Sequence, residues 1–279
     1  MKVAAIFIAG LALGAFGMSA FYNQRGSATK RIVIFAGAAA SPVYREACEA
    51  FESKYNVKVE LRLGGSGSLL SAMEIARVGD VYIPGSPEYL VKANKLGVVN
   101  LTAIPARVFA YLVPAILVQK GNPKGISTLE DLAKPGIRVG IADPESVCVG
   151  LYAKELLEFN GLWEDVKKNI VVHAESCEAT ATLIFTGTVD AIIGWHVFHY
   201  WNPEKTDLIW VEPEKIPKVG YIAGAVTVFA EDKEIAANFL DYLASQDMRG
   251  VWARYGYIPT LEEARIYASN ATIERGGLG

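Results

Sequence analysis

The pattern of apolar and polar positions predicts strands and helices in regular alternation. Short apolar runs of strand length are each followed by a stretch with helical periodicity. The first pair is a strand at 31–36 and a helix at 42–55, and the second is a strand at 57–63 and a helix at 69–77. The same pattern predicts strands at 80–83, 138–142, 170–173, 189–194, 208–211 and 221–230, and helices at 88–96, 150–160, 233–245 and 248–255, with another ending at Phe185. This order is typical of the α/β class with mainly parallel sheets.

Four strand-to-helix junctions are candidates for chemistry, because ligands of such sheets bind where strands end and helices begin. At the first junction, small residues lead to Ala40 and Ser41. Ser41 is predicted as the N-cap, with Pro42 at the first helical position. The free N–H groups of a first helical turn, and the positive end of its dipole, favour an anion without any charged side chain.

The other three junctions have related chemistry. Gly64–Ser68, with the sequence GGSGS, combines glycines that allow close approach with serine hydroxyls, and Ser66 lies at its centre. It matches neither a P-loop nor a dinucleotide fingerprint. The third junction leaves free N–H groups near Val149 and Gly150, and the fourth places Ser176 or Cys177 at an N-cap.

Composition and charge exclude some partners. The 279 residues are 52% hydrophobic and 20% charged, which is typical of a globular protein large enough for two lobes. The formal net charge is -3, and the basic residues form no cluster. Nucleic acid is therefore not expected as a partner.

The N-terminal segment predicts export. Val3–Tyr22 is almost entirely apolar, follows Lys2 and precedes a polar stretch, 23–30. This pattern is that of a signal peptide or an N-terminal membrane anchor with a short linker, so residues 1–30 are set apart from the fold. We expect the remaining chain to be extracytoplasmic, in the periplasm or at the outer face of the cell membrane.

Several motifs in a fixed order resemble the molybdate- and tungstate-binding proteins of ABC importers. They are FAGAAAS at 35–41, LGGSGSL at 63–69, IADPE at 141–145, GLYAKELLE at 150–158, and NFLDYLASQDMRGVWARYGYIP at 238–259. The resemblance covers about Arg31 to Pro259. It implies a two-lobed periplasmic binding protein-like fold of type II with the ligand cleft between lobes. Residues 31–112 and 222–279 would form lobe 1 and residues 113–221 would form lobe 2, with chain crossings near 111–115 and 219–225.

The resemblance also implies a ligand set and a role. A tetrahedral oxyanion would be held by neutral donors at Ala40, Ser41, Ser66, Val149, Cys177 and Trp195. Molybdate and tungstate are acceptor-only dianions, so donors and helix N-termini suit them. The expected protein is a monomeric receptor without catalytic activity, cofactor or resident metal, and it would deliver the anion to the permease subunits of the importer.

Three departures from the family pattern leave the identity of the anion open. Cys148-Val149-Gly150 stands where members usually have Pro-Ala-Gly. Trp195 replaces a tyrosine, although its indole N–H is still a donor. Gly194 stands where archaeal members place an additional carboxylate. Another small anion is the alternative ligand.

Four residues allow interpretations other than an oxyanion site. His196, His199, Cys148 and Cys177 together suggest a soft-metal site, while the two cysteines alone suggest a disulfide or simple packing. Neither Ser41 nor Cys148 lies in a nucleophile elbow or a cysteine-protease signature, so the sequence predicts no enzyme. Asn100 and Asn270 each begin a glycosylation sequon, a motif that often occurs by chance.

Overall fold

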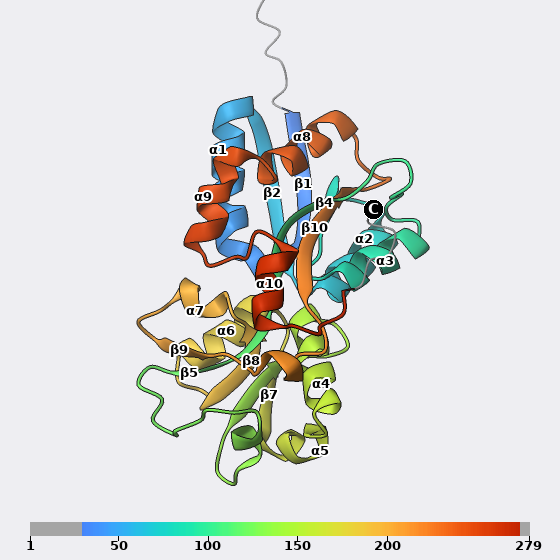
Figure 1. Ribbon diagram of the computed structural model, residues 1–279. Coiled ribbons are helices and arrows are strands. Elements are labelled where there is room, and N and C mark those ends of the chain that lie inside the picture. Colours follow the sequence, from blue (N-terminus) through green and yellow to red (C-terminus); the bar gives the residue numbers. More distant parts are fainter. Residues whose placement is uncertain (1–29, 274–279) are drawn as a thin grey trace, which may run out of the picture. The chain divides into compact units, whose positions relative to one another are not determined.

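The computed structural model describes residues 30–273 (Figure 1). The predicted signal peptide or anchor lies outside the described residues, apart from Lys30. Within residues 30–273, no helix is both long enough and apolar enough to cross a membrane.

The strands of this part of the chain form two five-stranded sheets. The first sheet has the order β2-β1-β3-β10-β4, with β1 at Lys30–Gly37, β2 at Val57–Gly64, β3 at Val81–Ile83, β4 at Arg107–Leu112 and β10 at Gly220–Val226. The second has the order β7-β6-β8-β5-β9, with β5 at Pro114–Gln119, β6 at Val139–Ala142, β7 at Ile170–Ala174, β8 at Ala191–Trp195 and β9 at Thr206–Ile209. We call each sheet with its helices a lobe.

Helices pack around both sheets (Figure 1). Those around the first sheet are α1 (Ser41–Tyr55), α2 (Ser66–Ala76), α3 (Pro87–Lys95), α8 (Lys233–Leu243) and α9 (Gln246–Arg254). Those around the second sheet are α4 (Cys148–Phe159), α5 (Trp163–Val166), α6 (Cys177–Phe185) and α7 (Phe198–Trp201). Their apolar faces, such as Ala153, Leu156 and Leu157 of α4, are fully buried, which supplies the main driving force for packing.

The predicted two-lobed α/β fold is confirmed, and its sheets are mixed. β1 is parallel to β3, and β6 is parallel to β7 and β8. β10 is antiparallel to β3 and β4, while β5 is antiparallel to β8 and β9. The antiparallel pairs include β4, β5 and β10, the strands on either side of the chain crossings.

The apolar run 109–119 divides between the sheets. β4 ends at Leu112 and β5 begins at Pro114, whose missing N–H removes one donor from the ladder. Between them, the Val113 N–H can donate to Nδ1 of His196 at 3.2 Å. Nε2 of His196 then donates to the Gly256 carbonyl at 3.0 Å, so one neutral imidazole joins three segments at the crossing.

Helix α10 (Leu261–Tyr267) contacts both lobes, because it packs on β4 of the first sheet and on η4 beside the second. Ala264 and Ala268 pack in the same hydrophobic cluster as residues of the second sheet. Tyr267 also stacks on Trp210 with ring centroids 4.0 Å apart. The predicted lobe limits stay a prediction.

Helix starts differ from prediction by one to a few residues. The short 3-10 helix η1 (Ala38–Ala40) leads into α1, so Ala40 is the N-cap and Ser41 the first helical residue. This corrects the prediction of Ser41 as the N-cap. At α6, Oγ of Ser176 accepts from the Ala179 N–H at 3.1 Å, which makes Ser176 the N-cap and Cys177 the first helical residue.

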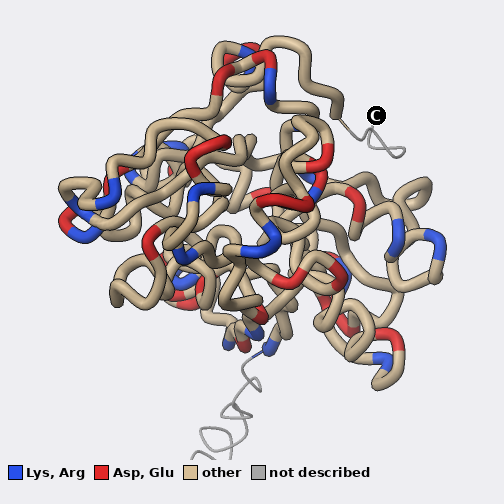
Figure 2. The backbone as a smooth tube through the Cα atoms, turned by 90° about the horizontal axis from the view of Figure 1, so that it is seen from below, with Lys and Arg blue, Asp and Glu red and all other residues tan. Residues whose placement is uncertain are grey.

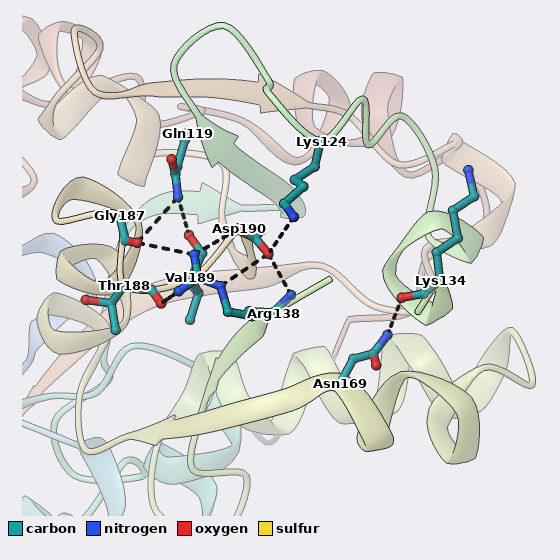
Figure 3. A network of polar contacts seen from close by, with 9 residues as sticks. All are labelled: Gln119, Lys124, Lys134, Arg138, Asn169, Gly187, Thr188, Val189 and Asp190. Carbon is teal, nitrogen blue, oxygen red and sulfur yellow. Dashed lines mark hydrogen bonds and ion pairs between the residues drawn. The ribbon is translucent and has the colours of Figure 1, made fainter. Parts of the chain in front are cut away.

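A polar network fixes the end of the second sheet at which β8 begins (Figure 3). The carboxylate of Asp190 accepts from the Arg138 backbone N–H and its guanidinium, both at 2.8 Å. Gln119 donates to the Val189 carbonyl at 2.8 Å. Burial by itself would raise the pKa of Asp190, but the bonds from Arg138 outweigh it and lower that pKa. The network therefore stays ionised and ties β5, β6 and β8 together.

Acidic and basic residues are interspersed over the surface (Figure 2). Most ion pairs join exposed side chains, such as Lys168 with Asp165. Exposed pairs of this kind contribute little to stability. The mixed pattern agrees with the absence of a basic cluster in the sequence.

Three further 3-10 helices complete the elements of the described residues. η2 (Glu130–Ala133) and η3 (Lys167–Asn169) pack against each other beside the second sheet, and η4 (Pro213–Lys215) packs against α10. These short 3-10 turns connect the lobes' regular elements without contributing to the candidate site.

Candidate functional site

The helix starts of the two lobes face each other. η1, which leads into α1, packs against α6. Arg45 of α1 forms an ion pair of 3.0 Å with Glu178 of α6. The Gly67 N–H, in the first turn of α2, donates to the Ser146 carbonyl of the other lobe at 3.0 Å. The lobes are therefore in contact where the sequence predicted the ligand.

Ser66 is buried at this contact and its hydrogen bonds are defined. Its Oγ accepts from the Gly85 N–H at 3.0 Å, which leaves the hydroxyl proton available for another acceptor. Its carbonyl accepts from the Tyr82 hydroxyl at 2.8 Å. The Tyr257 hydroxyl holds the Ala39 carbonyl in the same way, at 2.7 Å. Two buried tyrosines thus fix the turns that carry Ser66 and Ser41.

Cys177 and Cys148 are the first residues of α6 and α4, and their Sγ atoms lie 3.6 Å apart. Burial raises the pKa of the Cys177 thiol well above its usual value. The Val149 N–H and the Trp195 indole lie near the Cys177 sulfur and oppose that shift, although the indole does not meet the geometry of a hydrogen bond. The structure therefore brings Val149, Cys177 and Trp195 together, although they are far apart in the sequence.

Gly85 joins this group from lobe 1. A Cβ at Gly85 would collide with Sγ of Cys148 and would lie 2.9 Å from the Ala39 Cβ. The missing side chain lets the β3–α3 loop approach both η1 and the start of α4.

Buried donors without a partner lie among these turns. In the described residues, the Tyr44 hydroxyl, Oγ of Ser86 and Nε1 of Trp195 are buried and make no hydrogen bond, and the same holds for Nε1 of Trp201 in α7 and Oγ of Ser245 before α9. Burial raises the pKa of the Tyr44 phenol, and the charges of Cys148 and Cys177 in their thiolate form would raise it further. Ser86 follows Gly85 directly. Since buried polar atoms are normally paired, the three unpaired donors beside these turns are candidates to bind an acceptor.

Sequence reasoning missed Ser86 and Tyr44. Ser86 is the N-cap of α3, and its side chain makes no capping bond. A signal was present, because Ser86-Pro87 repeats the Ser41-Pro42 step after a short strand. Tyr44 gave no such signal, since an aromatic residue in a helix normally predicts only core packing.

The side chains that converge here carry no charge at neutral pH. Burial raises the pKa values of Tyr44, Tyr82 and Tyr257 well above the usual value, so these phenols stay protonated. Charged side chains lie at the edge of this region, on α3, α4 and the segment before β10. Lys218 pairs there with Glu88 of α3 at 2.7 Å and with Glu155 of α4 at 3.1 Å.

The predicted ligand residues fall into two groups. Ser66, Val149, Cys177 and Trp195 meet through the contacts above. Ala40 and Ser41 are buried and reach the same region through η1, which packs against α6.

The two histidines considered for a soft-metal site form hydrogen bonds with other groups. The ring of His196 bonds to backbone groups of Val113 and Gly256, and Nδ1 of His199 lies 3.1 Å from Oγ1 of Thr206. Among the described residues, no group of three or more His, Cys, Asp or Glu side chains is arranged to hold a metal ion. The cysteines therefore lack histidine partners here.

Comparison with known proteins identifies the family. The family model for bacterial extracellular solute-binding proteins matches residues 32–258. The chain belongs to this family. The solute-binding family consists of receptors, and the relatives below are binding proteins as well.

Two relatives and one structure illustrate the similarity. YvgL of Bacillus subtilis, named as an ABC transporter substrate-binding lipoprotein, is 25% identical over 92% of this chain and 98% of its own. The molybdate-binding protein ModA of Escherichia coli is 23% identical over 81% of this chain and 88% of its own. The sulfate-binding protein SubI of Mycobacterium tuberculosis has a similar fold, with a TM-score of 0.71 at 16% identity, over 90% of this chain and 96% of its own.

Proposed function

We propose that this solute-binding protein is the receptor of an ABC importer for one tetrahedral, acceptor-only oxyanion, with molybdate or tungstate preferred to sulfate. The observation that carries the proposal is the set of buried donors without partners, Tyr44, Ser86 and Trp195, among the first turns of the helices. We keep Ala40, Ser41, Ser66, Val149 and Cys177 as further ligand residues.

The chemistry of the donors selects the class of ligand. Hydroxyl, indole and backbone N–H groups can all donate, and the α4 and α6 termini add the positive ends of two helix dipoles. A dianion that only accepts hydrogen bonds satisfies all of them. Monohydrogen phosphate carries a proton that needs an acceptor. The indole and backbone N–H groups cannot accept it, so they favour molybdate, tungstate or sulfate over phosphate. The first three carry equal charge, and the spacing of the donors would separate them by size.

The relatives support both the ligand class and the partner. ModA is named for molybdate, and YvgL is named as a component of an ABC transporter. A receptor of this kind would be extracytoplasmic, held or exported through residues 1–30, and would dock on permease subunits as a monomer. It would be neither an enzyme nor a carrier of a resident cofactor.

Sulfate is the second candidate. It has the same charge and acceptors as molybdate but is smaller. SubI, a sulfate-binding protein, shares the fold over 90% of this chain, and the Cys148–Trp195 region departs from the pattern of molybdate receptors.

Calorimetric titration of the full chain in mild detergent, with molybdate, tungstate, sulfate and phosphate, tests the proposal. We expect one site per chain and the tightest binding for molybdate or tungstate. Sulfate binding that equals or exceeds molybdate binding would replace the first candidate with the second. Binding of a copper or zinc ion, with no response to any of the four anions, would refute an oxyanion receptor.

A further inference from the structure

We propose that Cys148 and Cys177 form a reversible dithiol–disulfide pair inside the anion site, and that their oxidation lowers the anion affinity. The statement on affinity rests on the proposed function, whereas the covalent statement rests on the cysteines alone.

The geometry of the pair carries the proposal. The two Sγ atoms are 3.6 Å apart, both thiols are free, and both side chains are buried. Each cysteine begins a helix, α4 or α6. While the lobes are closed, burial raises the pKa of Cys177 and keeps it a thiol. Opening of the lobes removes that burial, and the helix N-termini then favour the thiolate that reacts in disulfide exchange. The third cysteine, Cys48, lies within α1 and has no sulfur neighbour within hydrogen-bond distance in the described chain. Only one pair is therefore poised to react.

The residues around Cys148 and Cys177 favour disulfide formation over metal binding. A closed thiolate metal site needs further ligands, and the described residues provide no third histidine, cysteine or carboxylate there. Extracellular solute-binding proteins work where disulfides form and persist.

The oxidant is a small disulfide or a disulfide-bonded oxidoreductase. The thiolate of one cysteine attacks a sulfur of that disulfide, and one thiol is released. The second cysteine then attacks the mixed disulfide, which forms the Cys148–Cys177 bond and releases the second thiol. Two electrons pass to the oxidant, and the two cysteine protons end on the two released thiols.

Oxidation acts on the anion donors through the helix starts. A disulfide holds its sulfurs about 2.05 Å apart, so the two sulfurs must approach from 3.6 Å. Any part of this movement that side-chain rotation does not supply falls on the first turns of α4 and α6. These turns carry the Val149 and Cys177 N–H groups. Donors set for one anion lose affinity when their spacing changes by a fraction of an ångström to an ångström.

Closure of the lobes protects the pair. Gly85 of lobe 1 covers Cys148 so closely that a Cβ at Gly85 would collide with the sulfur, and both cysteines are about 1% exposed. An oxidant can reach them only when the lobes separate. A bound anion, by favouring closure, slows oxidation.

Oxidised glutathione tests the pair in the full chain in mild detergent. After timed exposure, free thiols are alkylated under denaturing conditions and the bridge is located by peptide mass spectrometry. We expect a Cys148–Cys177 bridge that dithiothreitol reverses, that forms several-fold more slowly with saturating molybdate, and that lowers molybdate affinity by about tenfold or more. Cys48→Ser is the matched control and should oxidise like the parent, whereas Cys148→Ser should form no internal bridge.

The outcomes separate the two proposals. A bridge involving Cys48, glutathione adducts without a bridge, or a Cys148–Cys177 bridge that changes molybdate affinity by less than twofold would overturn the inference. If the reduced protein binds none of the four anions, the proposed function and the statement on affinity both fail. Formation and reversal of the Cys148–Cys177 bridge would then still test the proposal of a reversible disulfide.

Discussion

At the residue scale, the Ser66 hydroxyl has the best-defined geometry among the proposed ligands. It accepts from the Gly85 N–H and can donate its own proton to the anion. Ser66→Ala and Ser41→Ala each remove a charge-assisted bond of about 1.5–3 kcal/mol. We expect molybdate affinity by calorimetry to fall about tenfold to over a hundredfold for each variant. Full affinity in both variants would contradict the placement of the site.

Trp195 tests a donor with no partner in the protein. Its indole is fully buried against Tyr152, with ring centroids 4.8 Å apart, and Nε1 makes no hydrogen bond. Trp195→Phe keeps most of the apolar area and deletes the donor. We expect molybdate affinity to fall by up to about a hundredfold, since one charge-assisted bond is lost. The free energy of unfolding without ligand should change little.

The control for this substitution is Trp163→Phe, at the start of the distant helix α5. It should leave molybdate affinity unchanged. Equal affinities for Trp195→Phe and the parent would remove Trp195 from the ligand set.

At the scale of elements, α3 and α4 are joined across the lobes. The Tyr152 hydroxyl donates to Glu88 at 3.0 Å, and Lys218 pairs with the same carboxylate at 2.7 Å. Burial lowers the pKa of Lys218, but Glu88 and Glu155 outweigh burial and raise it, so the lysine stays charged. Glu88→Gln weakens contacts that exist only when the lobes are closed. We expect molybdate affinity to fall about three- to tenfold, with faster release by stopped-flow fluorescence.

Glu46→Gln is the matched control for Glu88→Gln. Glu46 of α1 pairs with Arg254 of α9 at 2.6 Å within lobe 1, on the exposed surface. Its loss should leave both affinity and release rate unchanged. A similar effect of the two variants would mean that Glu88 does not act through lobe closure.

His196, at the chain crossing between the sheets, predicts how the free energy of unfolding depends on pH. Burial lowers the pKa of His196 from 6.5 to about 4. The unfolded chain therefore binds more protons than the folded chain between pH 6.5 and 4. The neutral imidazole makes its full contribution to the free energy of unfolding above pH 6.5. This contribution is lost as the pH falls from 6.5 to 4, by about 3 kcal/mol in total. Urea unfolding at pH 7 and pH 4.5 should show most of this loss in the parent.

His196→Gln is expected to lack this contribution, because glutamine does not titrate. The parent and the variant should differ less at pH 4.5 than at pH 7. Parallel pH profiles for the two proteins would contradict the assignment of the neutral imidazole to the crossing.

At the scale of the whole molecule, lobe closure depends on Gly65. It precedes α2 with φ −67° and ψ 136°, a conformation that alanine adopts freely. A Cβ there would lie 2.9 Å from the Glu175 carbonyl oxygen and 3.1 Å from that of Ser146, both in lobe 2. Gly65→Ala should therefore hold the lobes apart, lower molybdate affinity about tenfold or more, and leave the free energy of unfolding within about 1 kcal/mol.

Small-angle scattering with saturating molybdate checks this prediction, since the variant should keep a larger radius of gyration than the parent. Gly64→Ala is the control, because its Cβ would meet only the Leu69 side chain, at 3.3 Å in the same lobe. A ligand-bound variant as compact as the parent would show that closure tolerates the methyl group.

The sequence by itself determined the local structure of this protein. Alternation and helical periodicity depend on neighbours in the chain, so they predicted β1, β2, α1 and most other elements to within a few residues. The same local signals predicted anion donors at 40–41, 149 and 177, because the first turn of a helix has N–H groups without acceptors in the helix, and they predicted the hydroxyl donor of Ser66. The predicted free N–H of Gly150 is wrong, since it donates to the Val147 carbonyl at 3.0 Å. Motif order then indicated the family and its two lobes.

Only the tertiary structure decided which of these groups meet. The order of strands in the two sheets brings Gly85, Cys148 and Cys177 together, and no local pattern encodes that order. No local pattern predicted the antiparallel pairing in both sheets or the packing of α10 on elements of both lobes. Unpaired buried donors such as Tyr44 and Ser86 became visible only with every neighbour in place, because a polar atom is unpaired by virtue of its whole surroundings.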